Sequence, residues 1–245
     1  MTDAENGTPK VRFLSDVDVE LVRASARDSD VVFAAKVSTK GQQSLEGVDE
    51  DAASSAGLIG YLMRDRHGTP FEHNSMTFYV RAPIFVFREF MRHRIASYNE
   101  ESGRYRELRP DFYVPAPGRN LVQVGKPGHY EFEPGTAEQH EIVAKEIEAS
   151  CTQAYEAYRR MLDAGIAREV ARAVLPLTIY SSMYVTMNAR SLMNFLSLRT
   201  KREGSRFPSF PQREIEMVAE KMEAFWAELM PLTHAAFDKA GRVAP

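Results

Sequence analysis

Arginines, a hydroxyl and a glycine are concentrated between Arg81 and Arg109. The run Arg92-His93-Arg94 lies within this segment, and the triplet Ser102-Gly103-Arg104 follows after seven intervening residues. Guanidinium groups offer planar forks of donors that match phosphate and carboxylate groups, unlike the flexible point charge of lysine. In the triplet, a hydroxyl, an unhindered backbone and a guanidinium together can cradle a phosphate. These residue types indicate local recognition of an anionic ligand.

A structural role for the same arginines is an open alternative. Arg92 and Arg94 come at the end of an apolar helix, whose negative dipole end they would complement. They would then pair with Glu100 and Glu101 in exposed ion pairs. On the residues alone, the two interpretations carry similar weight.

The overall charge limits what the chain can bind. Its 245 residues carry 31 Lys and Arg against 34 Asp and Glu, giving a net charge of −3 and a pI near 6.1. A dedicated nucleic-acid binder normally has a global positive field, so we expect no nucleic-acid partner. A single-stranded nucleic-acid binder stays as an alternative, because Tyr98, Tyr105, Phe112 and Tyr113 are interleaved with the arginines. A helical oligomerisation protein with inter-chain arginine ion pairs is the third possibility.

Residue counts disfavour several other kinds of site. The single cysteine, Cys151, forbids a disulfide framework or a multi-thiolate metal site, and its apolar helical neighbours predict a core residue rather than a nucleophile. The fourteen glycines contain neither a G-x-G-x-x-G spacing nor a phosphate loop. No histidine pair has the i, i+4 spacing of a helical metal site, so we expect no metal. His129, His140 and His234 are expected to face solvent or to cap helices.

The chain is expected to lie in the cytoplasm as one domain. No apolar run approaches the roughly 20 residues that span a bilayer, so we expect no membrane partner. Residues 1–10 are polar, lack the apolar stretch of a secretory signal, and predict a flexible tail. Residues 11–245 are long enough to bury a core without disulfides and show no convincing linker.

The arginine-rich segments lie on two predicted strand-to-helix units. Residues 76–81 and 179–187 alternate apolar and polar side chains, as half-buried strands do. Pro83 suits the first turn of a helix that would carry the first arginine run. Asn188 stands where an N-cap belongs, before a helix that leads to Arg199.

The remaining periodicity completes the predicted fold. The capping-box pattern at Thr136 and the glycine at Gly165 bound a long amphipathic helix. We further predict a strand at 17–21, a loop at 39–49, and helices at 51–65 and 211–230, the last broken by Pro231. Strands and long helices without regular βαβ alternation indicate an α+β fold, with mainly antiparallel sheet packed against long helices and no Rossmann domain.

The arginine motif also resembles a known family. Arg92-His93-Arg94, seven residues and Ser102 are similar to the signature of the flavin-dependent thymidylate synthases. Ser97, Asn99, Glu100 and Arg104 agree with the longer form of the signature. The other blocks occur in the family's order and cover most of the domain: before the signature Thr69-Pro70-Phe71-Glu72-His73, and after it Arg168-Glu169-Val170-Ala171-Arg172, Leu175-Pro176, Asn188-Ala189-Arg190-Ser191 and Arg199.

The resemblance implies an activity, a cofactor set and an assembly. It implies reductive methylation of dUMP to dTMP, with 5,10-methylenetetrahydrofolate as carbon donor, NADPH as reductant and bound FAD as hydride carrier, yielding tetrahydrofolate. It also implies a homotetramer whose active sites lie at subunit interfaces. Because no thiol is available, activation of the uracil ring would be electrostatic or by direct hydride addition.

The resemblance further implies roles for individual residues. Arg199, Ser102 and His93 would be catalytic, although for Ser102 we favour a phosphate or ring contact because no histidine is placed to act as its base. The flavin-binding residues would be Thr69, Arg92, His93, Arg94, Glu100, Asn188, Arg190 and Asn194. The nucleotide-binding residues would be Glu89, Arg92, Ser102, Gly103, Arg104, Arg172 and Arg199.

Two features around Arg199 need explanation. On a helical wheel this arginine falls near Leu192 and Phe195, so it requires a partner on the apolar side; the alternative is a C-terminal dipole cap. The segment 200–210 is longer than the family pattern and lacks the histidine often found shortly after the arginine. Its basic residues would serve NADPH or folate, or form a solvated loop, and we favour the loop.

Overall fold

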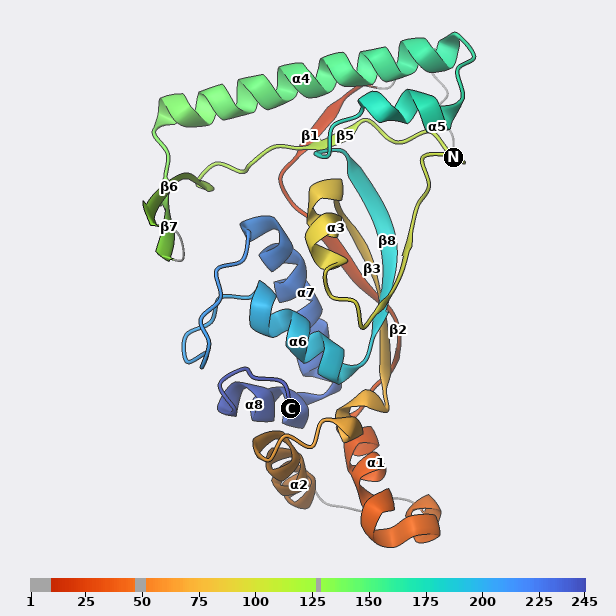
Figure 1. The fold of residues 1–245 in the computed structure, drawn as a ribbon, viewed down its shortest axis with the longest axis vertical. Helices are drawn as coiled ribbons and strands as arrows, with labels where there is room; N and C mark the ends of the chain where they lie inside the picture. The colour runs from red at the N-terminus through yellow and green to blue at the C-terminus, as the bar shows by residue number, and fades with distance from the viewer. Residues whose placement is uncertain (1–9, 47–51, 127–128) are drawn as a thin grey trace. The chain divides into compact units, whose positions relative to one another are not determined.

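The computed structural model describes residues 10–46, 52–126 and 129–245 (Figure 1). The predicted tail therefore lies outside the described residues except for Lys10. The chain forms two compact units, which are treated separately below. The first comprises the described residues of Met1–Asp16 together with Ala82–Phe85 and Glu101–Ser181. The second comprises Val17–Arg81, Val86–Glu100 and Ser182–Pro245.

A four-stranded sheet forms the centre of the second unit. Its strand order is β2-β3-β8-β4, with bounds Asp18–Ser25, Ser75–Pro83, Tyr180–Met187 and Ser97–Glu100. β2 pairs with β3, and β4 with β8, in antiparallel register. Met76, Phe78 and Val80 are fully buried on one face of β3, which is the alternation that predicted this strand. The strands expected at 17–21, 76–81 and 179–187 are confirmed.

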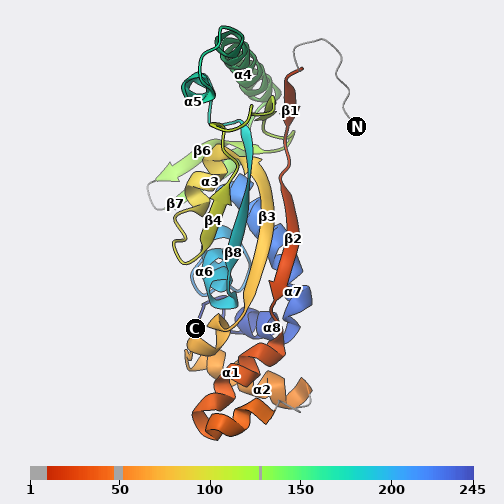
Figure 2. The same ribbon diagram turned by 90° about the vertical axis from the view of Figure 1, so that its right-hand side faces the viewer.

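Two long helices cover one face of this sheet (Figure 2). They are α6, Ala189–Arg199, and α7, Arg213–Leu229. The ring of Phe225 on α7 lies 6.4 Å from that of Phe78 on β3. The Asn188 side chain accepts a hydrogen bond from Ser191 N at 2.9 Å, so the predicted N-cap of α6 is confirmed.

The helix after β3 is shorter than its sequence pattern suggests. α3 spans Ile84–Phe90, so the helix ends before the Arg92-His93-Arg94 run instead of carrying it. The hydroxyl of Tyr98 donates to the carbonyls of Phe90 and His93 at 3.0 and 2.7 Å, which holds the chain in a turn at this point. The first arginine run therefore follows the helix as a turn.

The rest of the second unit is helical. α2, Ala52–Arg64, matches the predicted helix, whereas α1, Asp28–Lys40, is not predicted because Phe33 and Val37 leave its apolar side exposed. The predicted loop at 39–49 is wrong where it is described, since η1, Gly41–Glu46, is a 3₁₀ helix. α8 begins at Pro231 and runs to Lys239, so Pro231 starts a further helix as well as ending the previous one.

The first unit is built on the long helix α4, Ala137–Asp163. Thr136 caps it with the predicted reciprocal hydrogen bonds to Gln139, and Gly165 follows with a φ of +79°. Its buried face packs Tyr155 and Tyr158 against Leu108, and both tyrosine hydroxyls hydrogen-bond the Leu108 backbone at 3.3 Å. α5, Arg168–Ala171, and the 3₁₀ helix η3, Arg172–Val174, come next.

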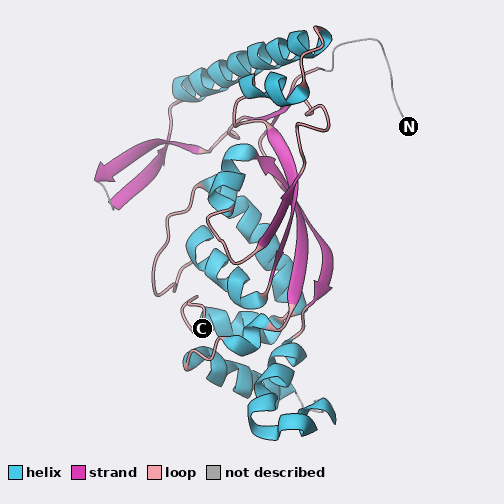
Figure 3. Cartoon of the chain, turned by 45° about the vertical axis from the view of Figure 1, so that its right-hand side comes forward, coloured by secondary structure: helices cyan, strands magenta, loops and turns pink. Residues whose placement is uncertain are grey.

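The first unit also contains two small strand pairs that are not predicted. β1, Arg12–Leu14, pairs in parallel with β5, Asp111–Tyr113, and an Arg12–Asp111 ion pair of 2.6 Å ties them. β6, Asn120–Lys126, and β7, His129–Pro134, form an antiparallel ribbon that precedes α4 in the chain (Figure 3). The predicted α+β class with mainly antiparallel sheet is confirmed. None of the helices in the described ranges has both the length and the apolarity needed to span a membrane.

Candidate functional site

Arg199 lies at the centre of a polar cluster in the second unit. It is the last residue of α6, and its Nη1 donates to Glu89 Oε2 on α3 at 2.9 Å. Its Nε lies 3.1 Å from Nε2 of His93, in the turn that follows α3. The Arg199 side chain is 20% exposed and that of Glu89 26% exposed. The partner that the helical wheel requires is therefore the Glu89 carboxylate together with the His93 imidazole.

Burial controls the charges in this cluster. Burial and the neighbouring Arg199 charge lower the pKa of His93 to about 4, so its imidazole is neutral near pH 7. The ring packs edge-on against Phe195, with centroids 4.9 Å apart. Burial raises the pKa of Glu89, and Arg199 offsets that effect only in part. A neutral imidazole and a carboxylate thus surround one permanent cation.

Arg92 and Arg94 flank His93 in the sequence, and both residues are exposed. In the described part of the chain neither guanidinium has an ion-pair or hydrogen-bond partner. The alternative in which they pair with Glu100 and Glu101 is wrong, because neither arginine has such a partner among the described residues and Glu101 lies 3.5 Å from Arg106 instead. Two guanidinium groups on either side of His93, neither paired within the described residues, are available to bind an anion.

A second arrangement in the same unit brings Arg190 onto the Gly68–Thr69 turn. Its Nη1 contacts Glu72 Oε1 at 2.5 Å, and its Nε donates to the Pro245 carbonyl at 2.8 Å. A β-carbon on Gly68 would lie 2.5 Å from the Arg190 Cζ, so only a glycine lets the guanidinium lie this close to the turn. The structure thus places Thr69 next to the glycine on which Arg190 rests.

The two asparagines assigned to the flavin differ in their availability. The amide oxygen of Asn188 is engaged as the helix cap described above. Asn194 is exposed, and its amide nitrogen donates to the carbonyl of Arg190 one turn earlier at 3.1 Å. Arg190 and Asn194 therefore share one face of α6, as predicted. Glu100 ends strand β4, opposite Met183.

The first unit holds the other predicted nucleotide residues. Gly103 is buried, and a β-carbon there would lie 3.2 Å from Cδ of Arg172, so the Arg172 stem packs on the Ser102-Gly103-Arg104 turn. The Ser102 hydroxyl accepts from Arg104 N at 3.3 Å, and Arg104 Nε contacts Glu169 at 2.8 Å. Arg172 is exposed without a partner among the described residues. A hydroxyl and a free guanidinium therefore flank one backbone turn, which suits a phosphate.

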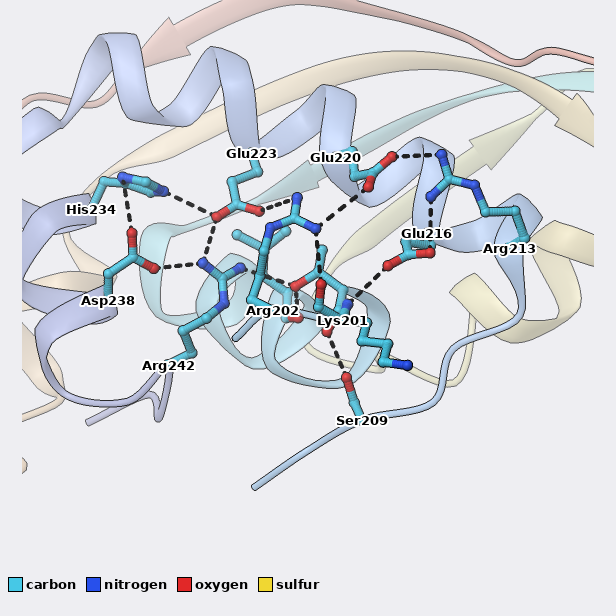
Figure 4. A network of polar contacts seen from close by, with 12 residues as sticks. Lys201, Arg202, Ser209, Arg213, Glu216, Glu220, Glu223, His234, Asp238 and Arg242 are labelled. Carbon is cyan, nitrogen blue, oxygen red and sulfur yellow. Dashed lines mark hydrogen bonds and ion pairs between the residues drawn. The ribbon is translucent and has the colours of Figure 1, made fainter. Parts of the chain in front are cut away.

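The second unit also contains an ion-pair network around Arg242 that the sequence analysis did not predict (Figure 4). The Arg242 side chain is 5% exposed, and its Nη1 donates to Glu223 at 2.7 Å and to Asp238 at 2.6 Å. Its Nη2 donates to Thr200 Oγ1 at 3.0 Å. The expectation that His234 faces solvent or caps a helix is wrong, because its Nε2 lies 3.0 Å from Glu223. Glu223 and Thr200 lie 19 and 42 residues from Arg242 in the chain, and contacts over such separations have no periodic signature in the sequence.

The same network contains three residues with metal-ligand chemistry. Ligand atoms of Glu223, His234 and Asp238 lie within 4.8 Å of one another, beside a cavity of about 640 Å³. Nη1 of Arg242 already lies between the two carboxylates at hydrogen-bond distance from both. The Arg242 guanidinium therefore occupies the position between the two carboxylates that a metal ion would need.

Segment 200–212 has no helix or strand, as expected for a loop, but its charges are not simply solvated. Arg202 lies 3.4 Å from Glu220 and 3.5 Å from Glu223 (Figure 4). The Lys201 backbone donates to Glu216 at 2.9 Å, and Ser209 donates to the Thr200 carbonyl at 2.5 Å. The contacts of Lys201 and Arg202 hold the loop against α7, and that of Ser209 closes the loop on itself.

Cys151 is a core residue, as its apolar stripe predicts. It is 2% exposed on α4, and its Sγ lies 3.2 Å from the Thr178 hydroxyl. Burial raises the pKa of the thiol, which keeps it protonated. A buried, protonated thiol is a poor nucleophile.

Comparison with known proteins agrees with the family resemblance of the arginine motif. A family described as thymidylate synthase complementing protein matches residues 20–232. The flavin-dependent thymidylate synthase of Streptomyces coelicolor is 66% identical over the whole of both chains, and that of Tropheryma whipplei is 61% identical over 95% of this chain and 97% of its own.

Solved structures agree as well. The UMP/dUMP methylase PolB from Streptomyces cacaoi, crystallised with 5-Br dUMP, superposes with a TM-score of 0.91 at 56% identity. That match covers 96% of this chain and all of the other. The resemblance inferred from the arginine motif is confirmed: the chain belongs to the flavin-dependent thymidylate synthase family.

Proposed function

We propose that this enzyme converts dUMP to dTMP, with 5,10-methylenetetrahydrofolate as carbon donor, NADPH as reductant and FAD as cofactor. The methylene carbon becomes a methyl group by gaining one hydride, so NADPH is oxidised to NADP⁺ and tetrahydrofolate is released. One observation carries the proposal: Arg199 is fixed by two protein partners, while Arg92, Arg94 and Arg172 have none among the described residues. The solved PolB complexes with 5-Br UMP and 5-Br dUMP support a pyrimidine nucleotide as substrate.

The phosphate of dUMP is assigned to the arginines and the turn of the first unit. Arg172 has no partner among the described residues and its stem packs on Gly103, and the Ser102 hydroxyl lies in the same turn. Two or more donors of this kind give short, charge-assisted hydrogen bonds to phosphate oxygens. Ser102 therefore acts as a ligand rather than as a nucleophile.

The uracil ring is assigned to Arg199. The ring becomes electrophilic when a cation lowers the energy of negative charge on its carbonyl oxygens. No cysteine step is needed for this, and the buried Cys151 is not placed to provide one. Glu89 holds the guanidinium, which keeps the cation in place without a reorganisation cost during the reaction.

The flavin is assigned to the Thr69 turn, Arg190 and Asn194, with Arg92 and Arg94 as anion ligands. The fit rests on the glycine turn against which Arg190 packs, since this places a guanidinium and backbone groups side by side. When bound, FAD supplies hydride transfer from NADPH to the transferred carbon. Glu72 orients Arg190 through the contact described above.

The assembly is proposed to be a homotetramer with active sites at subunit interfaces. The support is membership of the family, for which the resemblance implies this assembly. Light scattering of the purified protein tests the tetramer directly. A monomer at micromolar concentration would contradict it.

The visible spectrum of the purified protein tests the proposed function. We expect the absorbance bands of oxidised flavin after FAD is added, and their loss on reduction by NADPH. We also expect dUMP to bind, and Arg172→Ala to weaken dUMP binding at least tenfold. Absence of flavin binding, or salt-sensitive binding of oligonucleotides without affinity for dUMP, would contradict the proposal.

A further inference from the structure

The three nitrogens of the Arg199 guanidinium have different surroundings. Nε meets the imidazole of His93 and Nη1 meets the carboxylate of Glu89. Across residues 10–46, 52–126 and 129–245, Nη2 has no hydrogen-bond partner. One donor of the fork is therefore left for a ligand, while the other two fix the plane of the group.

The contact with His93 also determines where that imidazole carries its proton. A guanidinium stays protonated and has no acceptor, so Nε must be the donor in the 3.1 Å contact. Nε2 of His93 must then offer its lone pair, and a neutral imidazole with a free Nε2 lone pair carries its hydrogen on Nδ1. Arg199, which itself pairs with Glu89 at 2.9 Å, is the charged group that contacts the ring and lowers its pKa.

Neighbouring residues hold the imidazole in this orientation. The ring lies edge-on to Phe195, which stacks on Phe90 with centroids 4.5 Å apart. The hydroxyl of Tyr98 donates to the backbone carbonyl of His93. Ring and backbone are therefore both restrained, and burial raises the pKa of the Tyr98 hydroxyl to about 12, so it remains a donor.

We propose that His93 is a positioning residue: its neutral, Nδ1-protonated imidazole accepts from Arg199 Nε and so aims Nη2 at the substrate. This inference rests on the proposed function for the identity of the substrate, but not for the hydrogen bond. It departs from a general-base role, because the lone pair that a base would use is engaged by Arg199. The role is therefore to orient the cation, and no proton passes through Nε2.

Nitrogen NMR of the intact protein, labelled with ¹⁵N-histidine, tests the hydrogen bond without substrate. We expect one imidazole with a protonated Nδ1 and an unprotonated Nε2 that does not titrate between pH 5.5 and 8. His93→Gln removes that signal and so assigns it, while the His140→Gln control on α4 leaves it in place. Arg199→Ala should raise the pKa of His93, because burial and the Arg199 charge together hold it low. An imidazole at His93 that is protonated on Nε2, or that titrates near pH 6.5, overturns the proposal.

Kinetics separate positioning from proton transfer. Glutamine keeps an acceptor oxygen near the place of Nε2, whereas leucine keeps bulk without an acceptor. We expect His93→Leu to lower kcat at least a hundredfold, and His93→Gln to recover at least tenfold of that loss, with equal melting temperatures. Equal losses in both variants, together with loss of a pH limb of kcat, would indicate a general base and overturn the proposal. Failure of the proposed function would instead appear as no dUMP turnover at all, with the NMR result intact.

Discussion

The guanidinium carbon of Arg190 lies 2.5 Å from where a β-carbon on Gly68 would stand. The backbone of Gly68 has ordinary helical angles, φ −72° and ψ −32°, so an alanine is compatible with the chain itself. What an alanine would change is the place of the guanidinium, which would leave Glu72 and the Pro245 carbonyl. Glycine is thus required here by close approach rather than by backbone conformation.

Gly68→Ala is expected to weaken FAD binding about tenfold, roughly the loss of one charge-assisted contact. Flavin fluorescence titration of the purified variant measures this. Gly57→Ala is the matched control, because a β-carbon there meets nothing within 4 Å and the site lies in helix α2. The control should bind FAD normally and gain about 0.5–1 kcal/mol of stability. Equal FAD affinity in both variants would contradict the assignment of Arg190.

Arg242 is expected to be the most costly arginine to remove outside the substrate site. Its buried guanidinium joins α7, α8 and the end of α6, and truncation would leave the buried Glu223 carboxylate without its main partner. Arg242→Ala should therefore lower the free energy of unfolding by about 3–5 kcal/mol. Denaturant unfolding measures this.

Two comparison variants sharpen that test. Arg242 has a φ of +58°, so Arg242→Gly should be about 1 kcal/mol more stable than Arg242→Ala. Arg64→Ala removes an exposed ion pair with Asp65 and should leave the free energy of unfolding nearly unchanged. If Arg242→Ala lowers the free energy of unfolding no more than Arg64→Ala does, the Arg242 network does not stabilise the fold as proposed.

Stability should fall in acid through Glu223. Burial raises the pKa of this carboxyl, but hydrogen bonds from His234 and Arg242 outweigh it and lower the pKa to about 2. The unfolded chain takes up this proton near pH 4.5, so the stabilisation is complete above that pH and is lost as the pH falls toward 2. Glu223→Gln should flatten the dependence of unfolding free energy on pH below 5, while Glu228→Gln, exposed on the same helix, should not.

Cys151→Ala should keep full turnover. The thiol lies in the core of the first unit, where its loss costs on the order of 1 kcal/mol of stability and no chemistry. Steady-state dTMP formation and a melting curve separate the two effects. A variant that folds but forms no dTMP would revive a cysteine nucleophile.

The sequence predicts best where local chemistry decides the structure. Asn188 and Thr136 cap their helices as expected, because capping involves only neighbouring residues. Strand β3 follows its alternation, because one face is fully buried. Helix α1 escapes prediction because its apolar residues do not form one buried stripe.

Contacts between residues far apart in the chain limit how much of the site can be predicted from the sequence. The helical wheel shows that Arg199 needs a partner but cannot identify Glu89, which is 110 residues away in the chain. The end of α3 at Phe90 depends on Tyr98, which returns from β4 to hydrogen-bond the turn. In the Arg242 network, only the i, i+4 pair with Asp238 is local, whereas the contacts with Glu223 and Thr200 join side chains that no sequence pattern connects.

Mass-spectrometric detection of dTMP tests the central claim most directly. The protein, loaded with FAD, is incubated with dUMP, 5,10-methylenetetrahydrofolate and NADPH, and dTMP is counted against NADPH consumed. The account predicts one dTMP for each NADPH oxidised, at least a hundredfold less with Arg199→Ala, and undiminished formation with Cys151→Ala. NADPH consumption without dTMP, or full formation by Arg199→Ala, would contradict it.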